Sequence, residues 1–219
     1  MTEIECRDEI MDGVYRALCT HGYADLTVQN IADECSKSTS LLHYHYDTKD
    51  ELLGEFLDHI LNEYECRVEN RAEGTPVEQL CAFIARYVFG PDDKERESYH
   101  LALLEMRAQG PFDDQIRDEL VRADELHRET VVEMLEAGID AGEFEAVDVD
   151  RTAAFVVATL DGARTRQVTL GDNPPTNQPY TRTVAEETLS RVVDPLLTPD
   201  TERPTLAETL ADMPDWAER

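Results

Sequence analysis

Apolar residues recur at helical spacing from the beginning of this chain almost to its end. In the first twenty residues they stand at i, i+4, i+7 and i+8, as Ile10, Val14, Ala17 and Leu18. This spacing places them on one face of a helix, and no segment shows the strict alternation of a half-buried strand. The pattern predicts an all-α fold.

Capping residues divide the first seventy residues into four helices. Gly22 is a typical helix stop, and Thr27 and Ser38 are good N-caps for a second and a third helix. Thr48 begins a fourth helix and forms a capping box with Glu51. The residues expected to face the core of these helices are Ile31, Ala32, Leu41, Leu42, Leu52, Leu53, Phe56, Ile60 and Tyr64.

Proline and glycine separate the remaining helices. They are expected at 76–89, 95–108, 113–141, 150–170 and 183–197, with a short one near 206–213. The helix at 150–170 is strongly apolar in its first half, so it is expected to be buried on most sides.

The charge of the chain is unusual. It carries 48 acidic against 20 basic residues, a net charge of −28, and its only lysines are Lys37, Lys49 and Lys94. Such a chain repels itself at low ionic strength, whereas at molar salt the Debye length falls to about 3 Å and screens the repulsion. This composition indicates a halophilic host, and an ordinary acidic protein is the alternative.

Several classes of protein are disfavoured. The five cysteines form no CxxC pair, the N-terminus has no apolar core, and the longest apolar run is 153–160, which is too short to cross a bilayer. We therefore expect a soluble cytoplasmic protein with reduced thiols, no membrane association, no metal and no cofactor. A di-iron enzyme needs two Glu-x-x-His motifs, and only Asp124 with His127 approaches one. No phosphate-binding loop or Ser-His-Asp pattern is present, so we expect no enzyme.

One motif points to a family. It consists of Thr27, Ile31–Ala32, Ser38, the segment 42–46 and the segment 48–52. Over residues 8–54 its spacing and residue types resemble the TetR family of transcriptional regulators. The stretches 105–111, 138–144 and 161–162 look like the C-terminal domain of the subgroup with choline-responsive betaine regulators and efflux repressors.

The resemblance implies a set of DNA-binding residues. Thr27, His43 and Lys49 would hold the DNA backbone, while Ser38, Thr39, Ser40 and Tyr44 would face base edges with His45 near them. Alternatively, Ser38 and Thr48 are only helix caps, and Tyr44 and Tyr46 are core aromatics.

The chain departs from the family pattern at three positions. Ser36 replaces the usual turn glycine, at a cost of roughly 1 kcal/mol if its φ is positive. Lys37 stands where a buried valine is usual, so we expect it to face phosphate, and His43 replaces a tyrosine. Residues 24–50 hold five acids and two lysines, so the DNA head is net negative and the electrostatic part of DNA affinity is weak.

For the rest of the chain the resemblance implies a ligand pocket and a homodimer. Ordinary core packing is the alternative for each pocket candidate, and the acids Glu105 and Asp161 need partners if buried. The pocket candidates are Phe56, Ile60, Tyr64, Phe83, Tyr87, Leu103, Met106, Met134 and Phe155. Helices around 155–160 and 184–197 would pair with a second copy, so the target would be a near-palindromic double-stranded DNA.

These expectations combine into one interpretation. A three-helix helix-turn-helix domain at 1–47 precedes a helical ligand-binding and dimerisation domain at 48–198 and a tail at 199–219. The function expected is a regulator, most simply a repressor, that a small-molecule effector releases from its operator. The alternative is a helical ligand-binding or dimerising protein that has lost DNA binding.

Overall fold

The computed structural model describes residues 3–69, 74–89, 94–171 and 178–212. Their regular secondary structure is helical, as expected, and among these residues the only β-pairing is an isolated bridge between Phe144 and Leu197. The chain divides into two compact units, residues 1–69 with 92–124 and residues 70–91 with 125–219.

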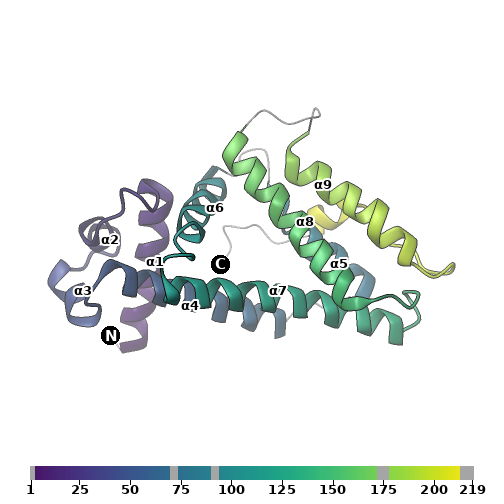
Figure 1. Cartoon of the computed structure of the whole chain (residues 1–219), viewed down its shortest axis with the longest axis horizontal. Coiled ribbons are helices and arrows are strands. Elements are labelled where there is room, and N and C mark those ends of the chain that lie inside the picture. The colour runs from purple at the N-terminus through teal and green to yellow at the C-terminus, as the bar shows by residue number, and fades with distance from the viewer. Residues whose placement is uncertain (1–2, 70–73, 90–93, 172–177, 213–219) are drawn as a thin grey trace. The chain divides into compact units, whose positions relative to one another are not determined.

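The first unit, called unit 1, holds the N-terminal helices (Figure 1). They are α1 (Glu3–His21), α2 (Val28–Glu34), α3 (Thr39–His45), α4 (Lys49–Glu69), α6 (Lys94–Arg107) and the first part of α7 (Asp114–Asp140). α1 packs against α2, α4 and α6. α1 comes close to the end of α2, since a Cβ atom on Gly13 of α1 would lie 2.6 Å from the Cβ of Cys35, the residue after α2.

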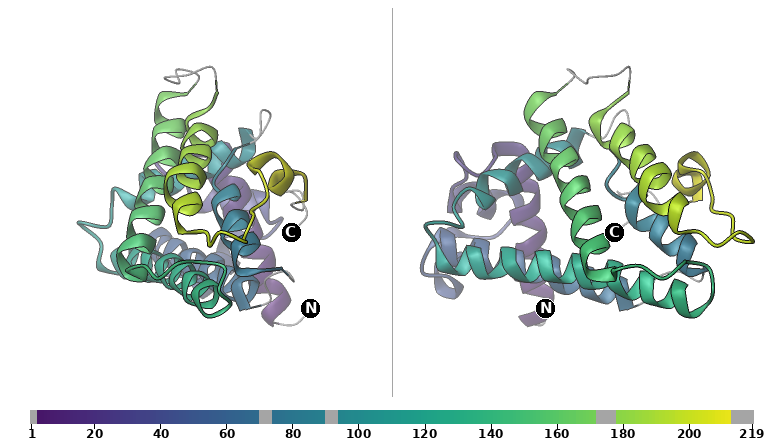
Figure 2. Two further views of the ribbon diagram at one scale, coloured as in Figure 1. Left: turned by 90° about the vertical axis from the view of Figure 1, so that its right-hand side faces the viewer. Right: turned by 45° about the vertical axis from the view of Figure 1, so that its right-hand side comes forward.

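The second unit, called unit 2, is built on a large apolar core. It contains the rest of α7, α5 (Pro76–Ala85), α8 (Val149–Leu170), α9 (Tyr180–Thr188), η1 (Leu189–Val193), η2 (Asp194–Leu196) and α10 (Leu206–Asp212). α8 and α9 form an antiparallel pair, and α10 lies on α5 (Figure 2). Gly138 and Phe144 meet closely, because a Cβ atom on Gly138 would lie 2.1 Å from the Phe144 ring.

The caps in unit 1 explain where its short helices begin. The Thr27 hydroxyl accepts from the Asn30 N–H at 3.1 Å, and the Ser38 hydroxyl accepts from the Leu41 N–H at 3.2 Å, as predicted. The Thr48 box forms only in part. Its hydroxyl accepts from the Glu51 N–H, but the Glu51 carboxylate accepts from the Asp47 N–H instead.

Three helix predictions were wrong in detail. The helix predicted at 76–89 ends at Ala85, and the next residues form turns with N–H groups donating to Ile84 and Ala85. The helix predicted at 183–197 begins at Tyr180 and widens into the π-helical η1 before Pro195, which lacks a backbone donor. The apolar half of α8 is not buried on most sides, because Ala154 and Phe155 point outward from it.

Candidate nucleic-acid interface

A tight turn sets α3 against α2. Ser36 adopts a φ of +53°, the left-handed region that glycine usually occupies. The Lys37 N–H then donates to the Ala32 carbonyl at 3.0 Å. Ser36 therefore adopts the glycine conformation of the family pattern, at the steric cost expected for a residue with a Cβ.

α3 has one buried anchor and a polar outer surface. Leu42 is 1% exposed, whereas Tyr44 is 82% exposed, so Tyr44 is not a core aromatic. Tyr46 is half-buried, and Thr39 at the first turn is half-buried as well. The exposed positions around Tyr44 are Ser38, Ser40, His43 and His45, and Thr27 is exposed at the start of α2.

Lys37 and Lys49, the two lysines near α3, both contact other residues of unit 1. Lys37 forms an ion pair with Glu9 of α1, and its side chain is only 14% exposed. In this structure the turn thus directs its ammonium toward α1, and the phosphate contact expected of it stays a prediction. Lys49 donates to the Leu26 carbonyl at 3.3 Å and lies 4.8 Å from the centre of the Tyr23 ring.

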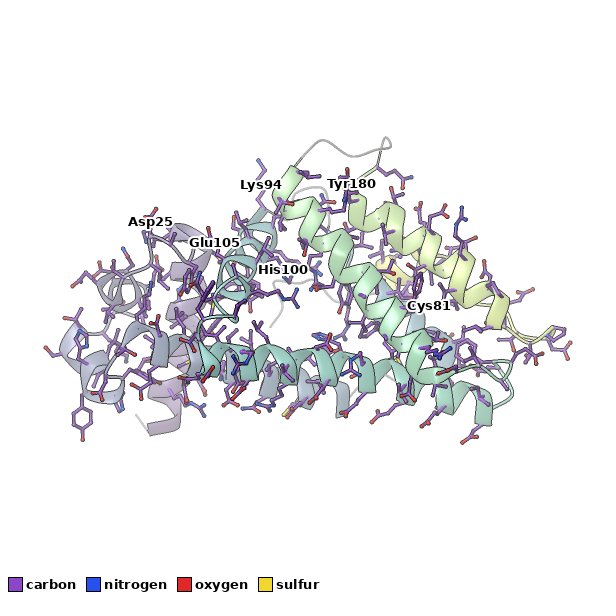
Figure 3. All side chains as sticks on the ribbon, viewed as in Figure 1. Asp25, Cys81, Lys94, His100, Glu105 and Tyr180 are labelled. Atoms are coloured by element: carbon purple, nitrogen blue, oxygen red, sulfur yellow. The ribbon has the colours of Figure 1, made fainter. Side chains whose placement is uncertain are left out.

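The loop between α1 and α2 is held by α6. Glu105, labelled in Figure 3, accepts from the Tyr23 N–H at 2.8 Å. A half-buried acid at this position thus has a protein partner, as its burial required. Burial, and then the negative charges of Asp50 and Asp113, raise the pKa of the Tyr23 hydroxyl.

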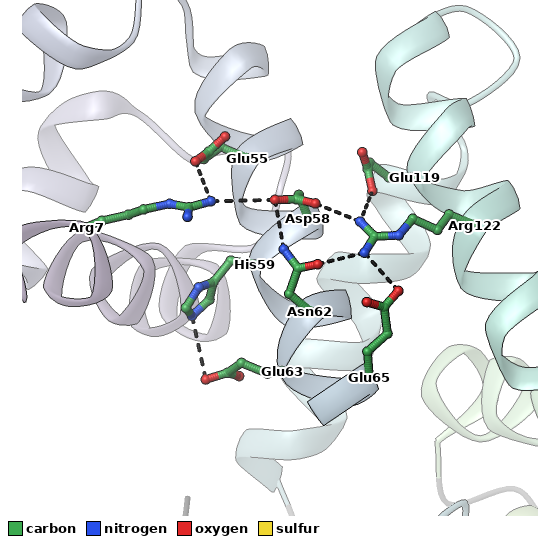
Figure 4. A network of polar contacts seen from close by, with 9 residues as sticks. All are labelled: Arg7, Glu55, Asp58, His59, Asn62, Glu63, Glu65, Glu119 and Arg122. Atoms are coloured by element: carbon green, nitrogen blue, oxygen red, sulfur yellow. Dashed lines mark hydrogen bonds and ion pairs between the residues drawn. The ribbon is translucent and has the colours of Figure 1, made fainter. Parts of the chain in front are cut away.

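A second polar cluster joins α4 to α1 and α7 (Figure 4). Arg122 of α7 contacts the α4 residues Asp58 at 2.6 Å, Asn62 at 2.6 Å and Glu65 at 2.8 Å. Arg7 of α1 pairs with Glu55 at 2.5 Å and with Asp58 at 3.5 Å. We call Arg122, Asp58, Asn62, Glu65 and Glu119 the Arg122 cluster.

The Arg122 cluster was not predicted from the sequence, although a signal was present. Asp58, Asn62 and Glu65 follow one another at i, i+4 and i+7, which is one face of a helix. Glu119 of α7 belongs to the same cluster, 3.6 Å from Arg122. Burial and the nearby Asp58 raise the pKa of its carboxyl.

The nine pocket candidates divide between the two units. Phe56 and Met106 are buried in unit 1, where Ile60, Tyr64 and Leu103 are half-buried. Phe83, Tyr87 and Met134 belong to the core of unit 2. Phe155 is 57% exposed, so its placement in the interior is corrected: this part of α8 has apolar residues on two faces, and only one face packs.

An aromatic group marks the core of unit 2. The Phe83 and Tyr87 ring centres lie 5.5 Å apart, and each lies 6.4 Å from that of His127. The Arg164 guanidinium sits 4.0 Å from the centre of the Tyr87 ring, within cation–π range. Two surface pockets of unit 2 lie elsewhere, one beside Arg128 and Asp150 and one beside Arg182 and Arg203.

Other classes of site find no support in the part of the chain that the structure describes. Within it, no group of three His, Cys, Asp or Glu side chains is arranged to hold a metal ion. Over the same residues, no helix has the length and apolar character needed to cross a membrane.

Two family models match this chain, one near its N-terminus and one over its C-terminal helices. A family model described as bacterial regulatory proteins of the TetR family matches residues 10–56. A second, described as the C-terminal part of BetI-type transcriptional repressors, matches residues 76–197.

Curated relatives match over short segments. The regulator HbdR of Aromatoleum sp. is 32% identical over 85 residues, which are 38% of this chain and 37% of that protein. BetI of Brucella abortus is 33% identical over 81 residues, 36% of this chain and 41% of that protein. The matched segments thus span about two fifths of these relatives' length.

Solved structures match over nearly the whole chain. A TetR transcription regulator from Haloarcula marismortui is 37% identical with a TM-score of 0.77, covering 89% of this chain and 99% of that one. A regulator from Saccharomonospora viridis, solved in complex with choline, has a TM-score of 0.73 at 20% identity, covering 90% of this chain and 100% of that one. From the two family models and the whole-chain match, the chain belongs to the TetR family of transcriptional regulators.

Proposed function

We propose that this protein is a transcriptional repressor that binds double-stranded DNA through α3 and leaves it when a small molecule binds. The observation that carries the proposal is the surface of α3, where Tyr44 is 82% exposed beside small hydroxyl residues. Short side chains let a recognition helix approach base edges, and a long one reaches past them.

The DNA contacts divide into two groups. Ser40 and Tyr44, with Ser38, Thr39 and His45 beside them, face base edges. Thr27, His43 and Lys49 contact the backbone, Lys49 after giving up the Leu26 carbonyl. Hydroxyls specify few bases by themselves, so DNA shape contributes much of the selectivity.

The active form is a homodimer that recognises a near-palindromic operator. The outward position of Phe155 on α8 supports this, because a large apolar side chain at a helix surface fits an interface with a second copy. Two recognition helices of such a dimer lie about 34–36 Å apart, one turn of DNA, or a multiple of it.

The effector binds in the helical domain. The choline complex of the Saccharomonospora viridis regulator supports a small organic ligand for this fold. In this chain the Tyr87 ring already holds the guanidinium of Arg164, so an effector that enters there must displace it or pack beside it.

Release from DNA follows from a shift of α4 and a change in the spacing of the two heads. To lower occupancy from 99% to 1%, the effector must prefer the released state by about 5.5 kcal/mol. A crystal structure of the effector-bound dimer tests this step. Heads that keep the spacing of the DNA-bound form would contradict it.

The protein works in a salt-rich cytoplasm, as its net charge of −28 and its similarity to the Haloarcula marismortui regulator support. In such a solvent the electrostatic part of DNA binding is screened, so affinity falls less steeply with salt than for a basic head. Titrations at 0.2 to 3 M KCl measure that slope, and a steep loss of affinity would contradict it.

Fluorescence anisotropy tests the function itself. Wild type is titrated in molar KCl with DNA from upstream of its own gene and with duplexes selected from a random library. Tyr44→Ala removes the recognition side chain and should abolish specific binding. Phe112→Ala is the matched control, because Phe112 is 87% exposed in the turn before α7 and should bind as wild type does.

A failure to bind DNA would point to the second candidate function. If wild type selects no duplex from the library, the chain is a helical sensor or dimerising protein without DNA binding. The engagement of Lys37 by Glu9 is the observation that favours this second candidate.

A further inference from the structure

We infer that operator binding by this protein is controlled by protons, through His43 and His45 on α3. The inference rests on the proposed function, because it concerns the charge of the same recognition helix. DNA affinity is high when both imidazoles are protonated and falls as pH rises through neutrality.

The first observation is that histidines are the only residues of α3 that can carry a positive charge. The helix contains no lysine or arginine, and its last turn holds two exposed histidines, His43 and His45. Phosphate contacts by cations supply most of the sequence-independent affinity of DNA-binding proteins. On this helix, only histidine can supply them.

The second observation is that the cations around α3 hold unit 1 together. Lys37 is paired with Glu9 and is largely buried, and Lys49 is bound to the Leu26 carbonyl and the Tyr23 ring. Arg16 donates to the Glu34 carbonyl at 2.8 Å and lies 3.5 Å from the Glu34 carboxylate. A phosphate that recruits one of these must break an existing contact, whereas both histidines are exposed.

Two aromatic rings and several charged side chains surround the histidines. The rings of Tyr44 and Tyr46 flank His45, with centres 5.1 and 6.3 Å away. Of the residue types present here, only histidine has an ordinary pKa near neutrality, whereas those of carboxylates lie below about pH 5 and those of lysine and tyrosine above about pH 9. The charged groups on the segments around α3 include Glu9 and Arg16 of α1, Asp33 and Glu34 of α2, Lys37 in the turn, and Asp47, Lys49, Asp50 and Glu51 around the start of α4.

Linkage gives the size of the effect. A phosphate beside His43, and the negative charge of the DNA around His45, favour the protonated imidazoles, so DNA binding takes up protons wherever the free protein is partly neutral. For each proton that binding takes up, the association constant falls by up to about tenfold for every unit by which the pH rises. For two histidines we expect a fall of about tenfold or more between pH 6 and pH 8.

The experiment is an anisotropy titration at one KCl concentration from pH 5.5 to 8.5, using a fluorescein-labelled duplex that wild type selects at pH 6. The variants are His43→Gln, His45→Gln and the double variant, which place a neutral amide where the imidazole stands. The double variant should bind weakly and lose the pH dependence to within about twofold. Circular dichroism confirms that each variant is folded.

Two further variants separate charge from shape. A protein with His43→Lys and His45→Lys together should bind at pH 8 about as well as at pH 6, because lysine keeps its charge. His59→Gln is the matched control, since His59 lies on α4, 3.6 Å from Glu63, and its variant should keep the wild-type pH slope.

The outcomes distinguish this inference from the proposed function. Binding by wild type that is independent of pH, but lost in Tyr44→Ala, overturns the inference and leaves the repressor in place. A double glutamine variant with the wild-type slope also overturns the inference alone. Selection of no duplex at any pH overturns both.

Discussion

Unit 1 and unit 2 both bury apolar residues, but charged contacts link the helices of unit 1 more than those of unit 2. Beside buried side chains such as Phe56 and Met106, unit 1 joins its helices by charged contacts, which include Lys37 with Glu9 and Arg122 with the acids of α4. Unit 2 packs twenty buried residues into one cluster, in which burial raises the pKa of the Cys81 thiol to about 12. We therefore expect the stability of unit 1 to depend on salt, and that of unit 2 to depend on how closely its side chains pack.

The largest effect is expected from Gly138→Ala in unit 2. The new Cβ would lie 2.1 Å from the Phe144 ring, and overpacking a core costs about 3 kcal/mol of unfolding free energy. Urea unfolding followed by circular dichroism measures it. Gly162→Ala is the control, because a Cβ there meets nothing within 4 Å and should stabilise α8 by about 0.5–1 kcal/mol. Equal urea midpoints for the two variants would show that the core of unit 2 rearranges to accommodate the added methyl group.

The next effect is expected from Arg122→Met in unit 1. The substitution leaves Asp58, Glu65 and Glu119 without their shared cation, at a cost of about 1–2 kcal/mol given their partial exposure. Because salt screens the remaining repulsion, the loss should shrink by about half between 0.1 and 2 M KCl. Arg151→Gln removes a pair whose arginine is 88% exposed and should change little. A loss of equal size at both salt concentrations would argue that Arg122 acts by packing.

A smaller effect of opposite sign is expected from Ser36→Gly. Ser36 has a φ of +53°, so glycine should relieve about 1 kcal/mol of strain and raise the melting temperature of the protein. Ser190→Gly tests the reverse case in η1, where glycine should cost about 0.5–1 kcal/mol. A lower melting temperature for Ser36→Gly would mean that the serine side chain contributes more than the strain removes.

The smallest effect is a pH dependence at Glu119. Burial raises the pKa of this carboxyl, so its protonated form favours the folded state. That stabilisation is present below the ordinary pKa and is lost as pH rises through the raised one. Glu119→Gln should therefore gain on wild type between pH 4 and pH 7, by less than about 1 kcal/mol.

Glu208 provides the comparison of opposite sign for the same unfolding series. Hydrogen bonds from the backbone and then the hydroxyl of Thr205 lower the pKa of its carboxyl. Its stabilisation is present above the ordinary pKa and is lost as pH falls through the lowered one, so Glu208→Gln should lose ground to wild type as pH rises. Parallel pH curves for both variants would contradict these assignments.

Local chemistry made much of this protein predictable from its sequence. The caps Thr27 and Ser38 act within three residues of themselves, and helical periodicity depends only on near neighbours. The all-α class and the family motif could therefore be recognised without a structure. The π-helical end of α9 could not, because its widening has no local sequence signal comparable to a cap.

Only the tertiary structure decided which charged and aromatic side chains face solvent and which are buried or paired. Lys37 meets Glu9 across 28 positions and Arg122 meets Asp58 across 64, distances over which no sequence period applies. The same packing leaves Tyr44 exposed while Leu42 two residues earlier is buried, and it turns Phe155 outward. The sequence determined which helices form and which side chains they carry. Their packing decided that the lysines around α3 stabilise the fold while its histidines face solvent, because burial and ion pairing depend on neighbours that only folding brings together.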